Sequence, residues 1–310
     1  MNRQAVAASA PKPSFGAAIT ASVPILFLIF AFLVGGGSRS DIASLPLLRS
    51  VAVLGAFWAA TRLTKGDWRR IRVPFALLVL LTAWIALQLV PLPPSLWHTL
   101  PGREIIISLD RLLGQPDLWR PISLTPSQTW NSLLAMTVPF AALFLAANLN
   151  LADYSRLLLA IVGVATISAL LGFFQLLSGT GGGAYLYRIT NSGSMVGLFA
   201  NRNHNAVFLA CATVIAAALL RDERMRRRKS RPMQIGLIFA GLTFTALTAL
   251  IGSRAGFVAG AVAFAVGYAM LVSSWRAPPA SRGGAPAPSG APGIWRYLVY
   301  SPPVLLAMLL

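Results

Sequence analysis

Two short polar segments carry residues whose types and spacing are suited to binding an anion. The first spans residues 197–205, GLFANRNHN, and leads directly into an apolar stretch. Asn201 or Asn203 can cap a helix that begins here. Arg202 and His204 then place positive charge at the positive end of the helix dipole, which is unfavourable for a cation. A bound anion removes this conflict, because free N–H groups, the dipole and the guanidinium all point at it.

The second segment, residues 252–256, reads GSRAG and forms a tight turn between two apolar runs. Ser253 can cap the helix that follows, and Arg254 lies in the first turn of that helix. We expect Arg188, which lies beside Tyr185 and Tyr187, on the same side of the membrane as both segments. Three arginines on one face with no acid nearby in the sequence predict a phosphate or diphosphate ligand.

Each of these residues also has a simpler interpretation. A single arginine at the membrane interface can extend its side chain to lipid phosphate without binding a substrate. His204 alone is typical of a polar residue at a helix interface, and Asn201, Asn203 and Asn205 can cap or bridge helices. The combination of all of them on one face is harder to explain in this way than any member alone.

Several other chemistries lack the residues that they need. The sequence has no Asp-x-Asp pair to hold a metal ion for a sugar-nucleotide transferase. Two histidines, His98 and His204, and one cysteine, Cys211, are too few for a histidine or cysteine metal site. The glycine run 179–183 lacks the Lys-Ser/Thr of a phosphate loop. We therefore predict no metal site and no cofactor.

The composition excludes a soluble protein. Of 310 residues, 56% are hydrophobic and only 11% are charged, whereas soluble chains are about a quarter charged. Apolar runs of roughly 20 residues predict about nine membrane spans and hence an all-α, polytopic transmembrane helical bundle. These spans are 16–35, 45–62, 73–92, 131–149, 156–178, 204–220, 234–251, 256–273 and a ninth that begins near Tyr297.

The basic residues predict the orientation. The net charge is +18, and Arg221–Arg231 is the densest basic cluster. The positive-inside rule puts this cluster, and with it the N-terminus, in the cytoplasm. We interpret the cluster as a topology signal on anionic membrane lipid rather than a nucleic-acid site.

Four regions follow from this orientation. Residues 1–15 form a cytoplasmic tail and 16–310 a membrane domain. Within that domain, 93–130 is an outer loop that contains an amphipathic helix near Arg103–Leu113, and 274–296 is a cytoplasmic linker rich in Pro and Gly. Because the last apolar run has no polar residue to end it, we expect the protein to continue beyond Leu310.

The two polar segments together resemble those of a known protein family. Residues 199–206, FANRNHNA, followed one hairpin later by GSRAG at 252–256, are similar to the O-antigen ligase/polymerase superfamily of polytopic bacterial membrane proteins. Residues 89–94, LVPLPP, and 121–126, PISLTP, resemble a subset of it. The resemblance covers most of the chain from about residue 70 onward.

The resemblance implies a metal-independent, all-helical glycosyltransferase fold in the inner membrane. Such proteins transfer a glycan from an undecaprenyl-diphosphate carrier to lipid A core or another lipid or polysaccharide acceptor on the periplasmic face. Arg254, as the arginine of the Ser-Arg-x-Gly motif, then binds the diphosphate. The catalytic base is expected in a further outer loop of the family, with His204 as a weaker catalytic candidate. The substrate-binding set is Arg254, Arg202, Arg188, Asn201, Asn203 and Ser253.

Two alternatives stay open. The first alternative is a truncated and inactive membrane protein. The family carries a further large outer loop with a His and an Arg, and these 310 residues do not include that loop. The other is a transporter for an anion, either bicarbonate-like or lipid-linked. The scarcity of ionisable residues in the middle of the spans argues against transport, because a transport pathway normally has polar groups at membrane depth.

Overall fold

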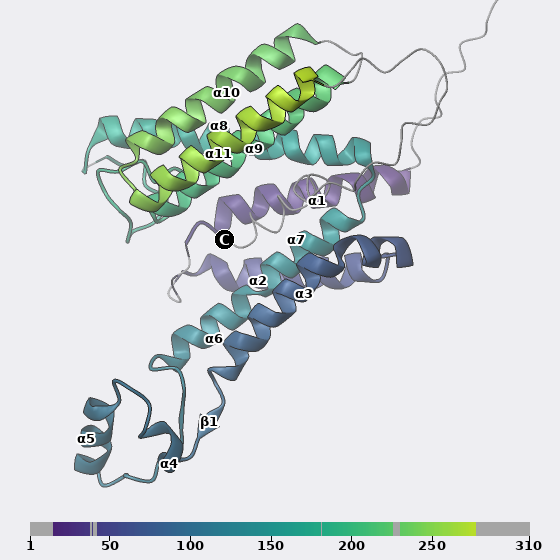
Figure 1. Ribbon diagram of the computed structural model, residues 1–310. Coiled ribbons are helices and arrows are strands. Elements are labelled where there is room, and N and C mark those ends of the chain that lie inside the picture. The colour runs from purple at the N-terminus through teal and green to yellow at the C-terminus, as the bar shows by residue number, and fades with distance from the viewer. Residues whose placement is uncertain (1–14, 38, 40–41, 181, 226–229, 277–310) are drawn as a thin grey trace, which may run out of the picture.

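The computed structural model describes residues 15–37, 39, 42–180, 182–225 and 230–276 (Figure 1). It is 73% helix and 2% strand, which agrees with the predicted all-α class. Most of the predicted N-terminal tail, most of the 274–296 linker and the predicted ninth span lie outside the described residues. The part of the Arg221–Arg231 cluster at 226–229 also lies outside them.

Within the described part, six helical segments are long and apolar enough to cross a membrane. They are α3 (Lys65–Leu87), α6 (Pro126–Ala135) with α7 (Thr137–Ala147), α8 (Leu151–Ser178), α9 (Arg202–Met225), α10 (Arg231–Leu250) and α11 (Arg254–Arg276). The apolar parts of α1 (Phe15–Val34) and α2 (Ser44–Ala60) are shorter. The chain is thus a multi-pass membrane protein, with helices at eight of the nine predicted spans.

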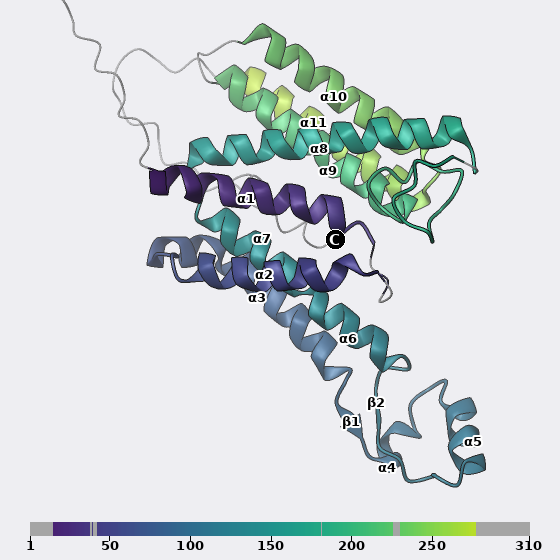
Figure 2. The same cartoon turned by 180° about the vertical axis from the view of Figure 1, so that it is seen from behind.

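The helices form two groups that meet at α1. In Figures 1 and 2, α8, α9, α10 and α11 lie on one side of α1, and α2, α3, α6 and α7 lie on the other. Phe32 of α1 packs on Phe199 and Phe208 of the first group. Phe27 of α1 belongs to a buried cluster with α2 and α7. Apolar contacts from both faces of α1 therefore join the two groups.

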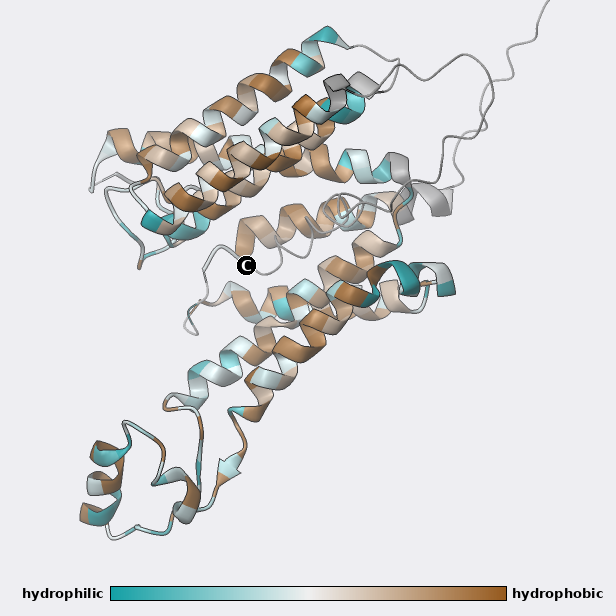
Figure 3. Cartoon of the chain, in the orientation of Figure 1, coloured by the Kyte–Doolittle hydropathy of each residue, from teal (hydrophilic) through white to brown (hydrophobic). Residues whose placement is uncertain are grey.

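Most of the helices consist largely of hydrophobic residues (Figure 3), and many of the large ones are exposed. Trp84 of α3, Phe239 of α10 and Phe257 of α11 are each more than half exposed. In water such a large apolar surface would favour aggregation, whereas lipid covers it without cost. This agrees with a membrane location for these helices.

Local signals explain where the helices begin and end. The α3 helix starts with a capping box, in which Thr64 and Asp67 bond each other's backbone N–H. Asn150 caps α8 by accepting a bond from the N–H of Asp153. At the turn between α10 and α11, Gly252 has a φ of 69°, which only glycine adopts freely.

The predicted outer loop is folded and projects from the bundle (Figure 2). It contains β1 (Pro91–Leu92), α4 (Pro94–Trp97), α5 (Glu104–Leu112) and β2 (Arg120–Pro121), with β1 antiparallel to β2. The helix predicted near Arg103–Leu113 is confirmed as α5. Both predicted bounds of the loop need a correction, because α3 ends at Leu87 rather than near residue 92 and α6 begins at Pro126 rather than near residue 131. Proline at the first helical position explains this start.

Candidate functional site

The helices α9 and α11 run parallel and in close contact. A Cβ placed on Gly256 would overlap the Cβ of Ala206, and one on Gly267 would lie 3.1 Å from the Cβ of Ala217. Because the two contacts have the same sequence offset, the helices point in the same direction. Their first residues, Arg202 and Arg254, therefore lie at the same end of the bundle. We call this end of the molecule the α9/α11 end.

The side chains predicted to cap these helices do so, with one exception. Asn201 Oδ1 accepts a bond of 2.8 Å from the N–H of Asn203, and Ser253 Oγ accepts one of 2.9 Å from the N–H of Gly256. The side chain of Asn203 is exposed and does not cap. A cap that the sequence did not predict comes from Asn191, whose Oδ1 accepts a bond of 3.0 Å from the N–H of Arg202.

These caps change which N–H groups are free for a ligand. On α9, the N–H groups of residues 202–205 all have acceptors, from Asn191 and from the side chain and carbonyl of Asn201. On α11, the N–H groups of Arg254 and Ala255 make no hydrogen bond within the described part of the chain. The expectation of free N–H groups at both helices is therefore wrong for α9 and holds for α11.

The guanidinium groups of the three predicted arginines have no partner in the described part of the chain. Arg188 and Arg254 are exposed and Arg202 is half-buried. None of these side chains forms a hydrogen bond or an ion pair with any described residue. The structure brings Arg202 and Arg254 to one end, while Arg188 lies in the loop that leads to α9. These cations are therefore available to an anion.

The loop of residues 179–201 packs back onto the bundle and carries Arg188. The N–H of Ala200 donates to the carbonyl of Gly36, which follows α1. Tyr187 lies against Gly37, and burial raises the pKa of the Tyr187 phenol while a hydrogen bond with the backbone of Gly36 opposes that rise. The loop is thus fixed to α1 at its Tyr187 and Ala200 contacts.

His204 belongs to the first predicted segment and lies half-buried in the first turn of α9. Its imidazole meets the ring of Phe199 edge-on, with 6.3 Å between ring centroids. It makes no hydrogen bond with a described residue. An imidazole in this position is chemically able to accept a proton, because neither nitrogen is occupied by the chain.

Sequence reasoning missed a buried polar network behind the site. Gln175 Nε2 donates to the carbonyls of Ala184 and Gly197, each at 3.0 Å, and its Oε1 accepts from the N–H of Gly197 at 2.8 Å. Ser168 Oγ donates to Asn205 Oδ1 at 2.9 Å. The signal for it was present, since Ser168 and Gln175 are polar residues inside an otherwise apolar run. The network fixes the loop that precedes Arg202.

The chemistry that this end offers is cationic. Within the described residues no three His, Cys, Asp or Glu side chains come together to hold a metal ion. Guanidinium groups and the two free N–H groups of α11 are suited to the oxygens of a phosphate or diphosphate. Comparison with known protein families, curated proteins and solved structures gave no match to this chain.

Proposed function

We propose that this chain is an inner-membrane protein of the O-antigen ligase/polymerase type. In this proposal it binds an undecaprenyl-diphosphate-linked glycan at the α9/α11 end and transfers the glycan to a lipid or polysaccharide acceptor on the periplasmic face. The observation that carries the proposal is the pair of parallel helices, α9 and α11, which both begin with an arginine that has no partner among the described residues.

The diphosphate would be bound mainly by Arg254 and Arg202. Each guanidinium presents a planar fork of donors that matches phosphate oxygens, and the free N–H groups of Arg254 and Ala255 add two more donors. Arg188 would contribute from the 179–201 loop. As the bond between the anomeric carbon and the diphosphate oxygen breaks, negative charge grows on the leaving diphosphate. Fixed positive groups stabilise that charge more in the transition state than in the ground state.

The acceptor hydroxyl would attack the anomeric carbon and lose its proton. His204 is the candidate base, because it lies two residues after Arg202 in the first turn of α9 and its imidazole has no hydrogen-bond partner in the described chain. The caps from Asn201 and Ser253 would hold the first turns of both helices in place, so these residues act by positioning. Asn203, which is exposed, would be the remaining contact to the ligand.

Direct binding of an isoprenyl diphosphate to the purified protein tests the proposal. Arg254→Lys and Arg254→Gln should each weaken binding by about tenfold or more, which corresponds to one charge-assisted hydrogen bond. Arg156→Gln is the matched control, because Arg156 is an exposed arginine that pairs with Asp153 far along α8 from the α9/α11 end. If Arg254→Lys binds the diphosphate as well as the parent does, the guanidinium fork has no specific role.

A measurement of anion flux distinguishes the proposed glycan transfer from anion transport. In proteoliposomes the proposal expects no protein-dependent flux of bicarbonate or inorganic phosphate. It also expects an isoprenyl diphosphate to bind more tightly than the corresponding monophosphate, since two phosphates engage more of the arginines. Measurable flux without preference for the diphosphate would contradict the proposal and favour an anion transporter.

A further inference from the structure

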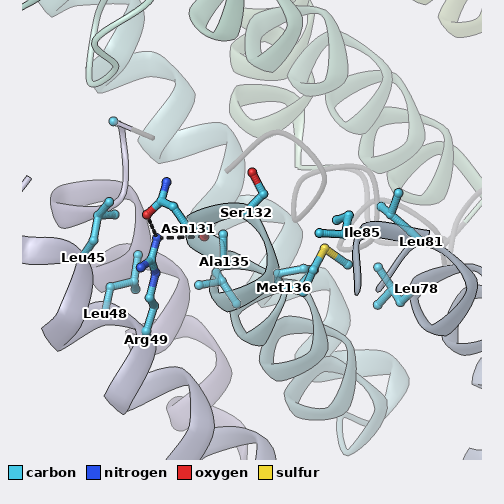
Figure 4. A pocket seen from close by; sticks show the side chains of 13 residues that line it. Leu45, Leu48, Arg49, Leu78, Leu81, Ile85, Asn131, Ser132, Ala135 and Met136 are labelled. Carbon is cyan, nitrogen blue, oxygen red and sulfur yellow. Dashed lines mark hydrogen bonds between the residues drawn. The ribbon is translucent and has the colours of Figure 1, made fainter. Parts of the chain in front are cut away.

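A second cationic site lies in the other helix group, away from the α9/α11 end. A cavity of about 470 Å³ opens between α2, α3 and the continuous α6–α7 pair (Figure 4). In the figure Arg49 and Asn131 lie on one side of it, and Leu78, Leu81 and Ile85 of α3 face them from the other. This volume falls within the range of about 300–1,000 Å³ typical of small-ligand pockets.

Arg49 lies inside the apolar helix α2 and has no counter-ion among the described residues. Its Nη2 donates to Asn131 Oδ1 at 2.6 Å and to the Asn131 carbonyl at 3.2 Å. Its Nε is buried and has no acceptor, and the side chain forms no ion pair with a described residue. None of the described residues that line the cavity is acidic. An uncompensated charge at this depth is costly, so an anion in the cavity would stabilise this arrangement.

The polar lining residues come from α2 and α6, whereas α3 contributes only apolar residues to the cavity. Arg49 comes five residues after Ser44, the first residue of α2, and so lies about 7.5 Å along the helix from that end. Asn131 and Ser132 line the cavity at the same level. Along α3 the lining runs from Ile85 to Leu78, which is roughly 10 Å at 1.5 Å per residue. The ligand that fits is therefore an amphiphile with an anionic head and an aliphatic chain.

We propose that this cavity binds an anionic membrane phospholipid. The phosphate accepts hydrogen bonds from the Arg49 guanidinium, whose Nε has no acceptor among the described residues, and part of one acyl chain lies along Leu78 and Pro139. A net-negative lipid is favoured over a zwitterionic one, because the described lining residues include no carboxylate to pair with a choline or ammonium group. This site does not depend on the function proposed for the α9/α11 end.

Lipid titration of the detergent-purified full chain, followed by native mass spectrometry, tests the proposal. The probes are didecanoyl phosphatidylglycerol, didecanoyl phosphatidylcholine and inorganic phosphate. We expect phosphatidylglycerol to bind at least about tenfold more tightly than phosphatidylcholine, as for one added charge-assisted hydrogen bond. Inorganic phosphate at the same concentration should not displace it. Equal binding of the two lipids, or displacement by phosphate alone, would overturn a lipid site.

Variants tie the binding to the cavity. Arg49→Gln should abolish the preference for phosphatidylglycerol, whereas Ala135→Leu, which keeps Arg49 but fills space in the cavity, should weaken that lipid about tenfold. Arg62→Gln is the matched control, because Arg62 follows the other end of α2 and lies over the ring of Trp58. If Arg49→Gln does not fold, the lipid preference of the parent and the effect of Ala135→Leu decide whether the cavity binds the lipid.

Two further readouts separate this site from the α9/α11 end. Arg49→Gln should bind an isoprenyl diphosphate as the parent does, and Arg254→Gln should bind phosphatidylglycerol as the parent does. A folded Arg49→Gln protein that keeps the parental preference for phosphatidylglycerol would refute the site, even if the diphosphate proposal stands.

Discussion

The loops 179–201 and 88–125 both connect membrane helices, yet they are held in opposite ways. Loop 179–201 takes its partners from the bundle, because the side chains of Ser168, Gln175 and Asn205 satisfy its buried backbone groups. Loop 88–125 closes on itself through the β1–β2 pair and through side chains of its own. One loop is therefore part of the helix bundle, and the other is a small unit attached to it.

This difference bears on function. A loop that is bonded to α8 and α9 fixes the first turn of α9, and with it the position of Arg202 and His204. A loop that satisfies its own polar groups can loosen without moving those residues. A destabilising substitution in loop 179–201 should thus also destabilise the α9/α11 end, whereas one in loop 88–125 should affect only that loop.

The largest effect that we predict comes from a matched pair of glycine substitutions. Gly197 has a φ of 59°, and a Cβ there would lie 2.7 Å from the carbonyl oxygen of Ser168 and 2.8 Å from Asn205 Oδ1. Gly114 in the other loop has a φ of 71° but nothing within 4 Å of the added atom. Gly197→Ala should lower the free energy of unfolding by about 3–5 kcal/mol, and Gly114→Ala by about 1 kcal/mol.

Reaction of Cys211 with a thiol-reactive fluorophore during heating measures this difference. Cys211 is the only cysteine and lies in α9, so its exposure reports on the helix group beside loop 179–201. Similar melting temperatures for the two variants would show that loop 179–201 is no more tightly coupled to the bundle than loop 88–125.

The sequence predicted what depends on neighbours along the chain. The caps by Asn201 and Ser253 and the helix at α5 follow from local patterns, and they are confirmed. The common end of α9 and α11 was predicted as well, because a hairpin of two spans returns the chain to the same face. The role of Arg254 as a diphosphate ligand stays a prediction.

The sequence did not predict contacts that depend on packing. The cap from Asn191 and the partners of Gln175 arise from a loop that folds back over α8, and no spacing rule gives that path. Arg49 interrupts the predicted span 45–62, so its presence was a signal, but its partner Asn131 lies 82 residues away. Helix register between distant segments is set by side-chain shape, which a periodic pattern does not contain.

A smaller effect should follow from replacing Gln175 of α8, which bonds loop 179–201, and Gln115 of loop 88–125 serves as its control. Gln175 is fully buried and bonds both the N–H and the C=O of Gly197. Gln175→Leu leaves those two groups unsatisfied, which should cost about 2–4 kcal/mol at roughly 1–2 kcal/mol for each group. Gln115→Leu, at an exposed position of loop 88–125, should change the melting temperature little. Equal shifts for the two variants would contradict the buried network.

The smallest effect should be confined to loop 88–125 and should depend on pH. A hydrogen bond from Arg120 to Asp110 lowers the pKa of the Asp110 carboxyl, burial opposes this, and the charges of Arg120 and His98 lower it further. Because the pKa in the folded loop is below its usual value, the ion pair stabilises the loop above that usual value. This contribution is lost as the pH falls through the lowered pKa of Asp110.

Hydrogen exchange of the loop backbone measures this contribution. At neutral pH, Asp110→Asn should speed exchange at residues 94–121 and leave α9 and α11 unchanged, because the ion pair contacts only the loop. Asp117→Asn is the matched control, since Asp117 is an exposed acid of the same loop without a hydrogen bond to a described residue. Faster exchange in α9 after Asp110→Asn would show that the two loops are coupled. Such a result would remove the distinction between a loop that positions the α9/α11 end and one that does not.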